Sequence, residues 1–110
     1  MKILNESNFT SAIESSRGLV LVKFFSPDCE PCKALDPTLE YMDSIYPHLS
    51  LKSVNVDENV ELALSLHIGP LPTIKFYRNG SPVYTQVGVS HPSVLEALTL
   101  ILYEKTQIST

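Results

Sequence analysis

The sequence contains little of what several classes of protein require. It has no tryptophan, two cysteines and four glycines, and 18% of its residues are charged. No stretch approaches the roughly 18 consecutive apolar residues that a membrane-spanning helix needs. The first residues also lack the sustained apolar core of a signal peptide. We therefore expect a cytoplasmic protein that does not enter a membrane.

A basic surface is missing as well. Eight Lys and Arg residues against twelve Asp and Glu residues give a formal net charge of -4. Binding of a phosphate backbone, and so of nucleic acid, is therefore not expected. No repeat, low-complexity segment or linker divides the 110 residues. We expect a single domain over residues 1–110, with a polar tail from about residue 105 that frays, and a monomer.

The two cysteines form one motif, Cys29-x-x-Cys32. It follows the apolar run 19–25 and precedes a helical pattern. A cysteine pair between a buried strand and the start of a helix is typical of reversible dithiol–disulfide chemistry. In a reducing compartment such a pair is redox-active or metal-binding more often than structural.

A zinc site is the alternative reading of two cysteines at this spacing. Zinc needs four ligands, and the sequence has no second Cys pair. The three histidines, His48, His67 and His91, are scattered along the chain. We therefore expect no metal, and we expect His67, near the end of a predicted helix, to cap that helix.

Hydrophobic periodicity and turn residues predict an alternation of helices and strands. Asn5 is expected to cap the first helix, Pro37 to kink the second, and Asn79-Gly80 to form a hairpin turn. The predicted helices cover residues 6–16, 32–45 and 57–66 and a segment starting at Pro92. The predicted strands cover residues 19–25, 49–56, 73–77 and 82–87. A very short strand at residues 3–4 can precede them. The buried stripe of the last helix is expected to be Val94, Leu95, Leu98, Ile101 and Leu102.

This order predicts an α/β fold. The strand–helix–strand unit from 19 to 56 implies parallel strands, and the hairpin adds antiparallel ones. The expected architecture is a mixed central sheet of four to five strands flanked by about four helices.

With these elements in order, the chain resembles the thioredoxin family from about residue 5 to residue 104. A lone Cys-x-x-Cys motif is a weak signal, but a Pro-Thr pair about 40 residues later, then Asn-Gly and a glycine, make it specific. The matching residues are Phe24-Phe25-Ser26 before the motif, Lys33 after it, Pro37, Asn55-Val56-Asp57, Leu71-Pro72-Thr73, Asn79-Gly80 and Gly88. The resemblance implies the thioredoxin fold and a thiol–disulfide oxidoreductase.

The roles of the cysteines follow from helix geometry and from this resemblance. Cys29 is expected to be the nucleophile, since a helix N-terminus favours a thiolate and this cysteine is the more exposed one in thioredoxin-like geometry. Cys32, more buried, would attack the mixed disulfide and release the reduced substrate. Pro31 stiffens the turn between them.

A second segment is expected beside the cysteines. By resemblance, the bond before Pro72 is cis and this proline keeps metals from the sulfurs, although an ordinary trans turn proline is the alternative. The backbone just before it pairs with substrate in this family, which puts Leu71 in a substrate groove with Thr73 and Gly88.

The sequence departs from the family pattern in three ways. Asp28 stands where a tryptophan is common, and Glu30 where a glycine is common. These two carboxylates are expected to raise the pKa of Cys29, while Lys33 and the helix dipole oppose that shift. Lys23 stands where thioredoxins carry a buried aspartate, and Ser53 replaces that aspartate's usual lysine partner. Lys23 is expected either to extend its ammonium to the surface or to approach the cysteine pair, and resolution is expected to be slower than in an ordinary thioredoxin.

The function expected from the sequence is reduction of protein disulfides through a reversible Cys29–Cys32 pair. The implied partners are disulfide-containing proteins and an electron donor of the thioredoxin-reductase type, and no cofactor beyond the dithiol is needed. A specialised oxidoreductase with one dedicated partner is a variant of this reading. A thioredoxin-fold binding or regulatory module, with little general reductase activity, is the alternative from another class.

Overall fold

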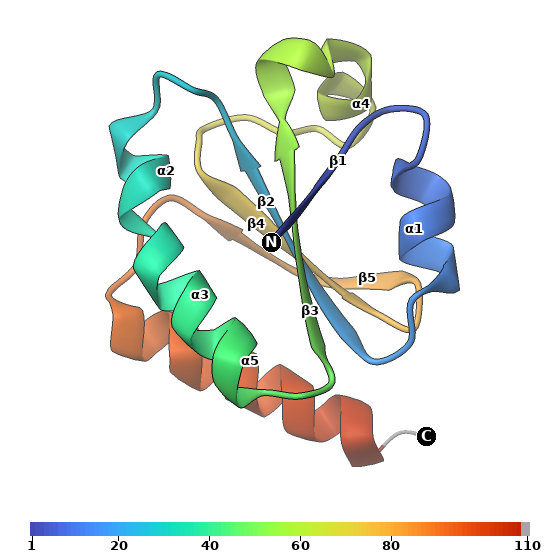
Figure 1. The fold of residues 1–110 in the computed structure, drawn as a ribbon, viewed down its shortest axis with the longest axis vertical. Helices are drawn as coiled ribbons and strands as arrows, with labels where there is room; N and C mark the ends of the chain where they lie inside the picture. Colours follow the sequence, from blue (N-terminus) through green and yellow to red (C-terminus); the bar gives the residue numbers. More distant parts are fainter. Residues whose placement is uncertain (109–110) are drawn as a thin grey trace.

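A five-stranded mixed sheet forms the centre of the molecule (Figure 1). The computed structural model describes residues 1–108, with side chains described as far as Thr106. The strands are β1 (Lys2–Leu4), β2 (Leu19–Phe25), β3 (Leu49–Asn55), β4 (Thr73–Arg78) and β5 (Ser81–Val87), in the spatial order β1-β3-β2-β4-β5. The strands β1, β3 and β2 are mutually parallel, whereas β4 is antiparallel to β2 and β5 is antiparallel to β4. The predicted mixed α/β sheet is confirmed.

Helices cover both faces of this sheet. Their bounds are α1 (Phe9–Ser15), α2 (Glu30–Ala34), α3 (Asp36–Ile45), the 3-10 helix η1 (Val56–Glu58), α4 (Val60–Ser65) and α5 (Pro92–Ile108). In Figure 1, α3 and α5 lie together on one side of the strands, and α1 and α4 lie on the other. No helix in the described part of the chain is long and apolar enough to cross a membrane.

Strand β2 lies at the middle of the sheet because both of its faces are apolar. Leu19 and Leu21 pack in one cluster with Leu39 of α3 and Leu95 of α5. Val20, Val22 and Phe24 pack in a second cluster with Phe9 of α1. The alternation places Lys23 on the same face as Leu19 and Leu21, beneath the start of α3.

The second helix predicted from the sequence is divided at Leu35. We expected Pro37 to kink one helix over residues 32–45, and this was wrong: α2 ends at Ala34 and α3 begins at Asp36. Proline has no N–H to continue the ladder but is well suited to the first turn of a new helix. Pro37 occupies that first turn, and Asp36 is therefore the first residue of α3.

The first and third helices also begin later than expected. Asn5 does not cap a helix at Glu6; its side-chain oxygen accepts from the N–H of Ser7 and of Asn8, and this local turn delays α1 until Phe9. The helix expected from residue 57 is interrupted at Asn59. The buried amide of Asn59 donates to the carbonyl oxygen of Asn55 at 2.9 Å and accepts from the N–H of Glu6.

The predicted stripe of the last helix is buried only in part: Leu95 is buried and Leu98 and Leu102 pack against the core, as expected. Val94 and Ile101 are 55% and 54% exposed, whereas Thr99 and Thr106 are buried. Threonine can be buried here because its hydroxyl donates to a carbonyl oxygen one turn earlier, as Thr99 does to Leu95 at 2.8 Å. Fraying was expected after Glu104, but α5 continues to Ile108; the last two residues of the predicted tail lie outside the described residues.

The hairpin turn has the expected geometry. Asn79 and Gly80 both have positive φ, at 49° and 89°. Two positive φ angles define the type I′ turn, whose twist matches that of the strands it joins. The prediction of an Asn-Gly hairpin between β4 and β5 is confirmed.

Candidate active site

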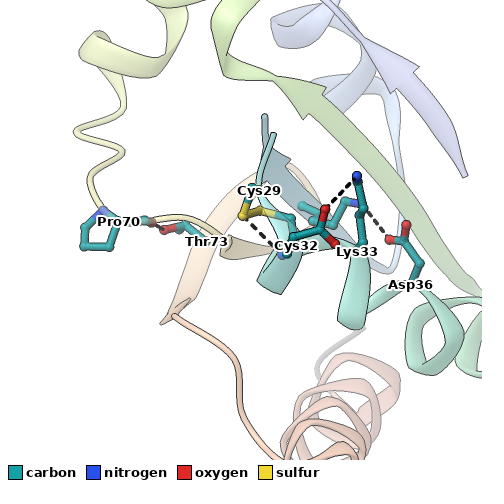
Figure 2. Close-up of a disulfide and its surroundings, with 8 residues drawn as sticks. Cys29, Cys32, Lys33, Asp36, Pro70 and Thr73 are labelled. Atoms are coloured by element: carbon teal, nitrogen blue, oxygen red, sulfur yellow. Dashed lines mark hydrogen bonds and ion pairs between the residues drawn. A yellow bond between two sulfur atoms is a disulfide. The ribbon is translucent and has the colours of Figure 1, made fainter. Parts of the chain in front are cut away.

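The two cysteines lie where β2 gives way to α2. Cys29 caps α2, and Cys32 is the third residue of that helix. Their Cα atoms are 5.3 Å apart, and the two sulfurs are joined as a disulfide, shown in yellow in Figure 2. Pro31 lies in the first turn of α2, where its fixed φ suits the helix. A motif with two intervening residues therefore brings both sulfurs to one helix end at bonding distance.

The two sulfurs differ in environment. Cys32 is 1% exposed, whereas Cys29 is half-buried. The backbone N–H of Cys32 donates to Sγ of Cys29 at 3.2 Å. One sulfur is therefore accessible from solvent and receives a hydrogen bond, and the other is enclosed by the protein.

Charged side chains surround the pair unevenly. Asp28 and Glu30 flank Cys29 and are both exposed. Lys33 donates to Glu30 at 3.2 Å, and both of these side chains are mostly in solvent. An exposed pair of this kind contributes little to stability. It does partly neutralise the Glu30 carboxylate, so Asp28 is the less compensated charge beside Cys29.

Lys23 is buried, with its side chain 8% exposed. Its Nζ lies 2.6 Å from Oδ1 of Asp36 and 4.7 Å from the centroid of the Phe25 ring. Of the two placements expected for Lys23, the one with its ammonium at the surface is therefore wrong; Lys23 instead lines a cavity together with Cys32. Ser53, which faces Lys23 across the β2–β3 ladder, is also buried.

Asp36 is a residue that the sequence interpretation missed. Lys23 and Asp36 are 13 positions apart, and their pairing depends on where α3 begins. Two signals could have found it. A lysine inside a buried strand needs an anionic partner, and an aspartate directly before proline is well placed at a helix start.

The segment that enters β4 lies beside the disulfide. Antiparallel pairing sets Thr73 opposite Phe24, near the end of the strand that leads to the cysteines. Figure 2 draws Pro70 and Thr73 in the surroundings of the disulfide, with Thr73 Oγ1 donating to the carbonyl oxygen of Pro70 at 2.7 Å. The Leu71–Pro72 peptide bond is cis.

Gly88 is joined to this segment although it lies 16 positions further along the chain. Its N–H donates to the carbonyl oxygen of Pro72 at 2.8 Å. Leu71 is half-buried and Pro72 and Thr73 are buried. The four residues expected to form a substrate groove are thus held together at the end of the sheet nearest Cys29.

Metal ligands do not gather in the part of the chain that the structure describes: no three His, Cys, Asp or Glu side chains there are close enough to hold an ion. His67 follows Leu66, the residue that caps the C-terminus of α4, and its backbone has a positive φ of 58°.

Comparison with known proteins identifies the architecture. The sequence model of the thioredoxin family matches residues 1–100. Thioredoxin of Chlamydia pneumoniae is 37% identical over 89% of this chain and 94% of its own length, and thioredoxin of Bacillus subtilis is 33% identical over 89% and 95%. A solved structure of Plasmodium falciparum thioredoxin superposes with a TM-score of 0.81, at 36% identity over 89% of this chain and 95% of that one.

The similar proteins and the bonded cysteines of this chain indicate the same chemistry. The cysteines are bonded at the end of a buried strand, and the matched segment contains the whole sheet and both clusters of its core. The protein is a thiol–disulfide oxidoreductase with a Cys-x-x-Cys redox pair. The chain belongs to the thioredoxin family.

Proposed function

We propose that this protein reduces disulfides in other proteins, with Cys29 as the attacking thiol and Cys32 as the resolving thiol. The observation that carries this assignment is the difference between the two sulfurs. Cys29 is half-buried and accepts the N–H of Cys32, so a thiolate there is both reachable and hydrogen-bonded. Cys32 is 1% exposed and meets only a disulfide already formed at Cys29.

The reaction balances without a bound cofactor. The Cys29 thiolate attacks a substrate disulfide, one substrate sulfur leaves, and a mixed disulfide forms. The Cys32 thiolate then attacks Cys29, the bond to substrate breaks, and the second substrate sulfur leaves as a thiolate that takes up a proton. Two electrons have moved from the dithiol to the substrate. An electron donor of the thioredoxin-reductase type restores the dithiol.

The substrate groove is proposed at Leu71, Pro72, Thr73 and Gly88. Leu71 precedes β4, whose ladder with β5 begins at Thr73. An extended substrate segment can therefore pair with the backbone at Leu71 as an added strand, beside Cys29. Asp28, in place of an apolar ring, makes the rim of this groove more polar and narrows the set of substrates.

The compartment and the state of assembly are part of the proposal. Both cysteines of the chain lie in the redox motif, a composition that suits a reducing compartment, and we place the protein in the cytoplasm as a monomer.

A redox titration tests this function. The protein is equilibrated across dithiol–disulfide buffers, free thiols are alkylated, and the adducts are counted by mass. A reversible two-electron transition is expected, together with reduction of insulin disulfides that Cys29→Ser abolishes. Failure to form the intramolecular disulfide at any poise, or a normal disulfide with no reduction of insulin, would instead favour a binding module.

A further inference from the structure

A buried ion pair lies next to the redox motif, and the reaction described above gives it no role. The ammonium of Lys23 is held at 2.6 Å from Asp36 inside the protein. Removing a lysine from water is costly, and an apolar side chain at the same place would often serve stability as well or better. Stability alone is therefore a weak explanation for this pair.

The ion pair borders a cavity that is lined by only one of the two cysteines. The cavity has a volume of about 330 Å³, and Lys23, Asp36 and Ser53 line it. Two further cationic groups, Lys33 and the N-terminal residue Met1, also line it, but the Lys33 side chain is 58% exposed and Met1 is exposed, so solvent screens both. Of the two cysteines, Cys32 lines it. Any electrostatic effect of the pair thus acts first on the resolving thiol.

The two ends of the pair are not equally screened. The Lys23 side chain is 8% exposed, and the Asp36 side chain is 37% exposed. Solvent weakens the field of the carboxylate more than that of the ammonium, because interactions in the interior are less screened than those at the surface. The ammonium is therefore the less screened of the two charges of this pair at the cavity.

Cys32 has a need that this ammonium meets. Burial disfavours the thiolate form of a cysteine, yet only the thiolate can attack the mixed disulfide. We propose that Lys23 stabilises the Cys32 thiolate during resolution, and that Asp36 is a positioning residue that holds the Lys23 ammonium at the cavity. This inference rests on the proposed function, in which Cys32 resolves the mixed disulfide.

The step is an exchange of one sulfur–sulfur bond for another. The thiol proton of Cys32 passes to solvent, and the thiolate attacks Sγ of Cys29. The bond between Cys29 and the substrate breaks as the Cys29–Cys32 bond forms, and the substrate sulfur leaves with the electron pair.

A single-turnover experiment separates the two chemical steps. Reduced protein is mixed with a peptide disulfide, quenched in acid, and the mixed disulfide is quantified by mass. Lys23→Met is expected to slow decay of the mixed disulfide about tenfold at pH 7, with its formation changed less than twofold. The pH profile of decay is expected to move to higher pH, and Lys23→Arg is expected to restore both rate and profile.

A matched control removes the same charge elsewhere in the sheet. Lys52 lies on β3 beside Ser53 and points to the opposite face, so Lys52→Met is expected to leave both steps unchanged. Decay at the wild-type rate in Lys23→Met would overturn the role of Lys23, and equal slowing of formation and decay would show a structural effect instead. Failure of the reduced wild type to exchange with the peptide at all, with neither a mixed disulfide nor reduced peptide formed, would overturn the proposed function itself.

Discussion

The backbone N–H of Cys32 donates a 3.2 Å hydrogen bond to Sγ of Cys29. The residue that later resolves the reaction therefore also stabilises charge on the sulfur that begins it. The amide makes this bond whatever the side chain at position 32, so the two contributions of Cys32 can be separated by substitution.

Replacing Cys32 with serine is expected to stop the reaction halfway. Cys32→Ser keeps the amide that bonds Sγ of Cys29, so attack continues and a stable mixed disulfide with substrate accumulates. Cys29→Ser is expected to give no adduct, because the remaining thiol is 1% exposed. Non-reducing mass analysis after incubation with insulin distinguishes the two. A trapped adduct in Cys29→Ser would reverse the assigned roles.

The charges beside Cys29 are expected to set how reactive it is. Asp28→Asn removes an exposed like charge and should raise the rate of Cys29 alkylation at pH 7 about twofold at low salt. Glu30→Gln should have a smaller effect, because Lys33 already pairs with Glu30. Stopped-flow alkylation of the reduced protein measures both rates. The difference should vanish in 1 M salt, where the screening length is about 3 Å; a difference that persists would rule out an electrostatic cause.

Asp36 is expected to matter for folding as well as for resolution. Asp36→Asn leaves the buried Lys23 without its anionic partner and should lower the free energy of unfolding by about 2 kcal/mol, a value reduced because Asp36 is partly exposed. Asp43→Asn, an exposed carboxylate further along α3, is the matched control and should change it by less than about 0.5 kcal/mol. Urea denaturation gives both values.

A double replacement tests the same pair from the other side. In Lys23→Met with Asp36→Leu, neither charge remains to be buried, so stability should return to that of the wild type or exceed it. A double variant as unstable as Asp36→Asn would show that packing, and not charge, accounts for the loss.

Tyr77 is expected to give the protein an alkaline limit. It is 5% exposed, and burial raises its pKa from 10.0 to about 12. The folded state therefore keeps a proton that the unfolded state loses, so the stabilisation is fully present below pH 10 and is lost as the pH rises toward 12. Two pH units correspond to about 3 kcal/mol.

Tyr77→Phe keeps the ring that packs edge-on against Phe9 but removes the titrating group. Unfolding by urea at pH 9 and pH 11.5 should show a smaller decline for this variant than for the wild type. The pKa of Tyr46 is also raised, first by partial burial and then by Glu96. The decline in the free energy of unfolding of Tyr46→Phe over the same pH range is therefore compared with that of Tyr77→Phe. If the free energy of unfolding fell equally with pH in the wild type and in Tyr77→Phe, Tyr77 would not be the group that sets the alkaline limit.

Much of the fold could be predicted because local sequence signals agreed with one another. The nearly continuous apolar run of β2, the Asn-Gly turn and the alternation of elements each pointed to the same sheet. The buried stripe on α5 could be predicted only in part from apolar residues. Thr99 and Thr106 bury polar side chains whose hydroxyls bond within the helix, while the apolar Val94 and Ile101 face outward.

The residues of the site likewise include some that could be predicted from the sequence and some that could not. Cys29 and Cys32 are adjacent in a motif, so their pairing could be predicted from spacing. Lys23 and Asp36 meet only because β2 ends beneath a helix that begins at Asp36. That contact depends on tertiary geometry. A prediction of one helix over residues 32–45 could not show that Asp36 lies at the start of a helix.

The borders of the sheet bear on how molecules of this protein meet one another. One border is β1, which is only three residues long, and the other is β5, which carries Pro82 near its start. A short strand gives few backbone groups for another chain to pair with, and a proline takes one donor away. In the described part of the chain, β1 therefore offers almost no template for strand pairing between copies, and β5 offers seven residues with one donor removed at Pro82. Any edge-to-edge association between copies should accordingly use β5 and not β1.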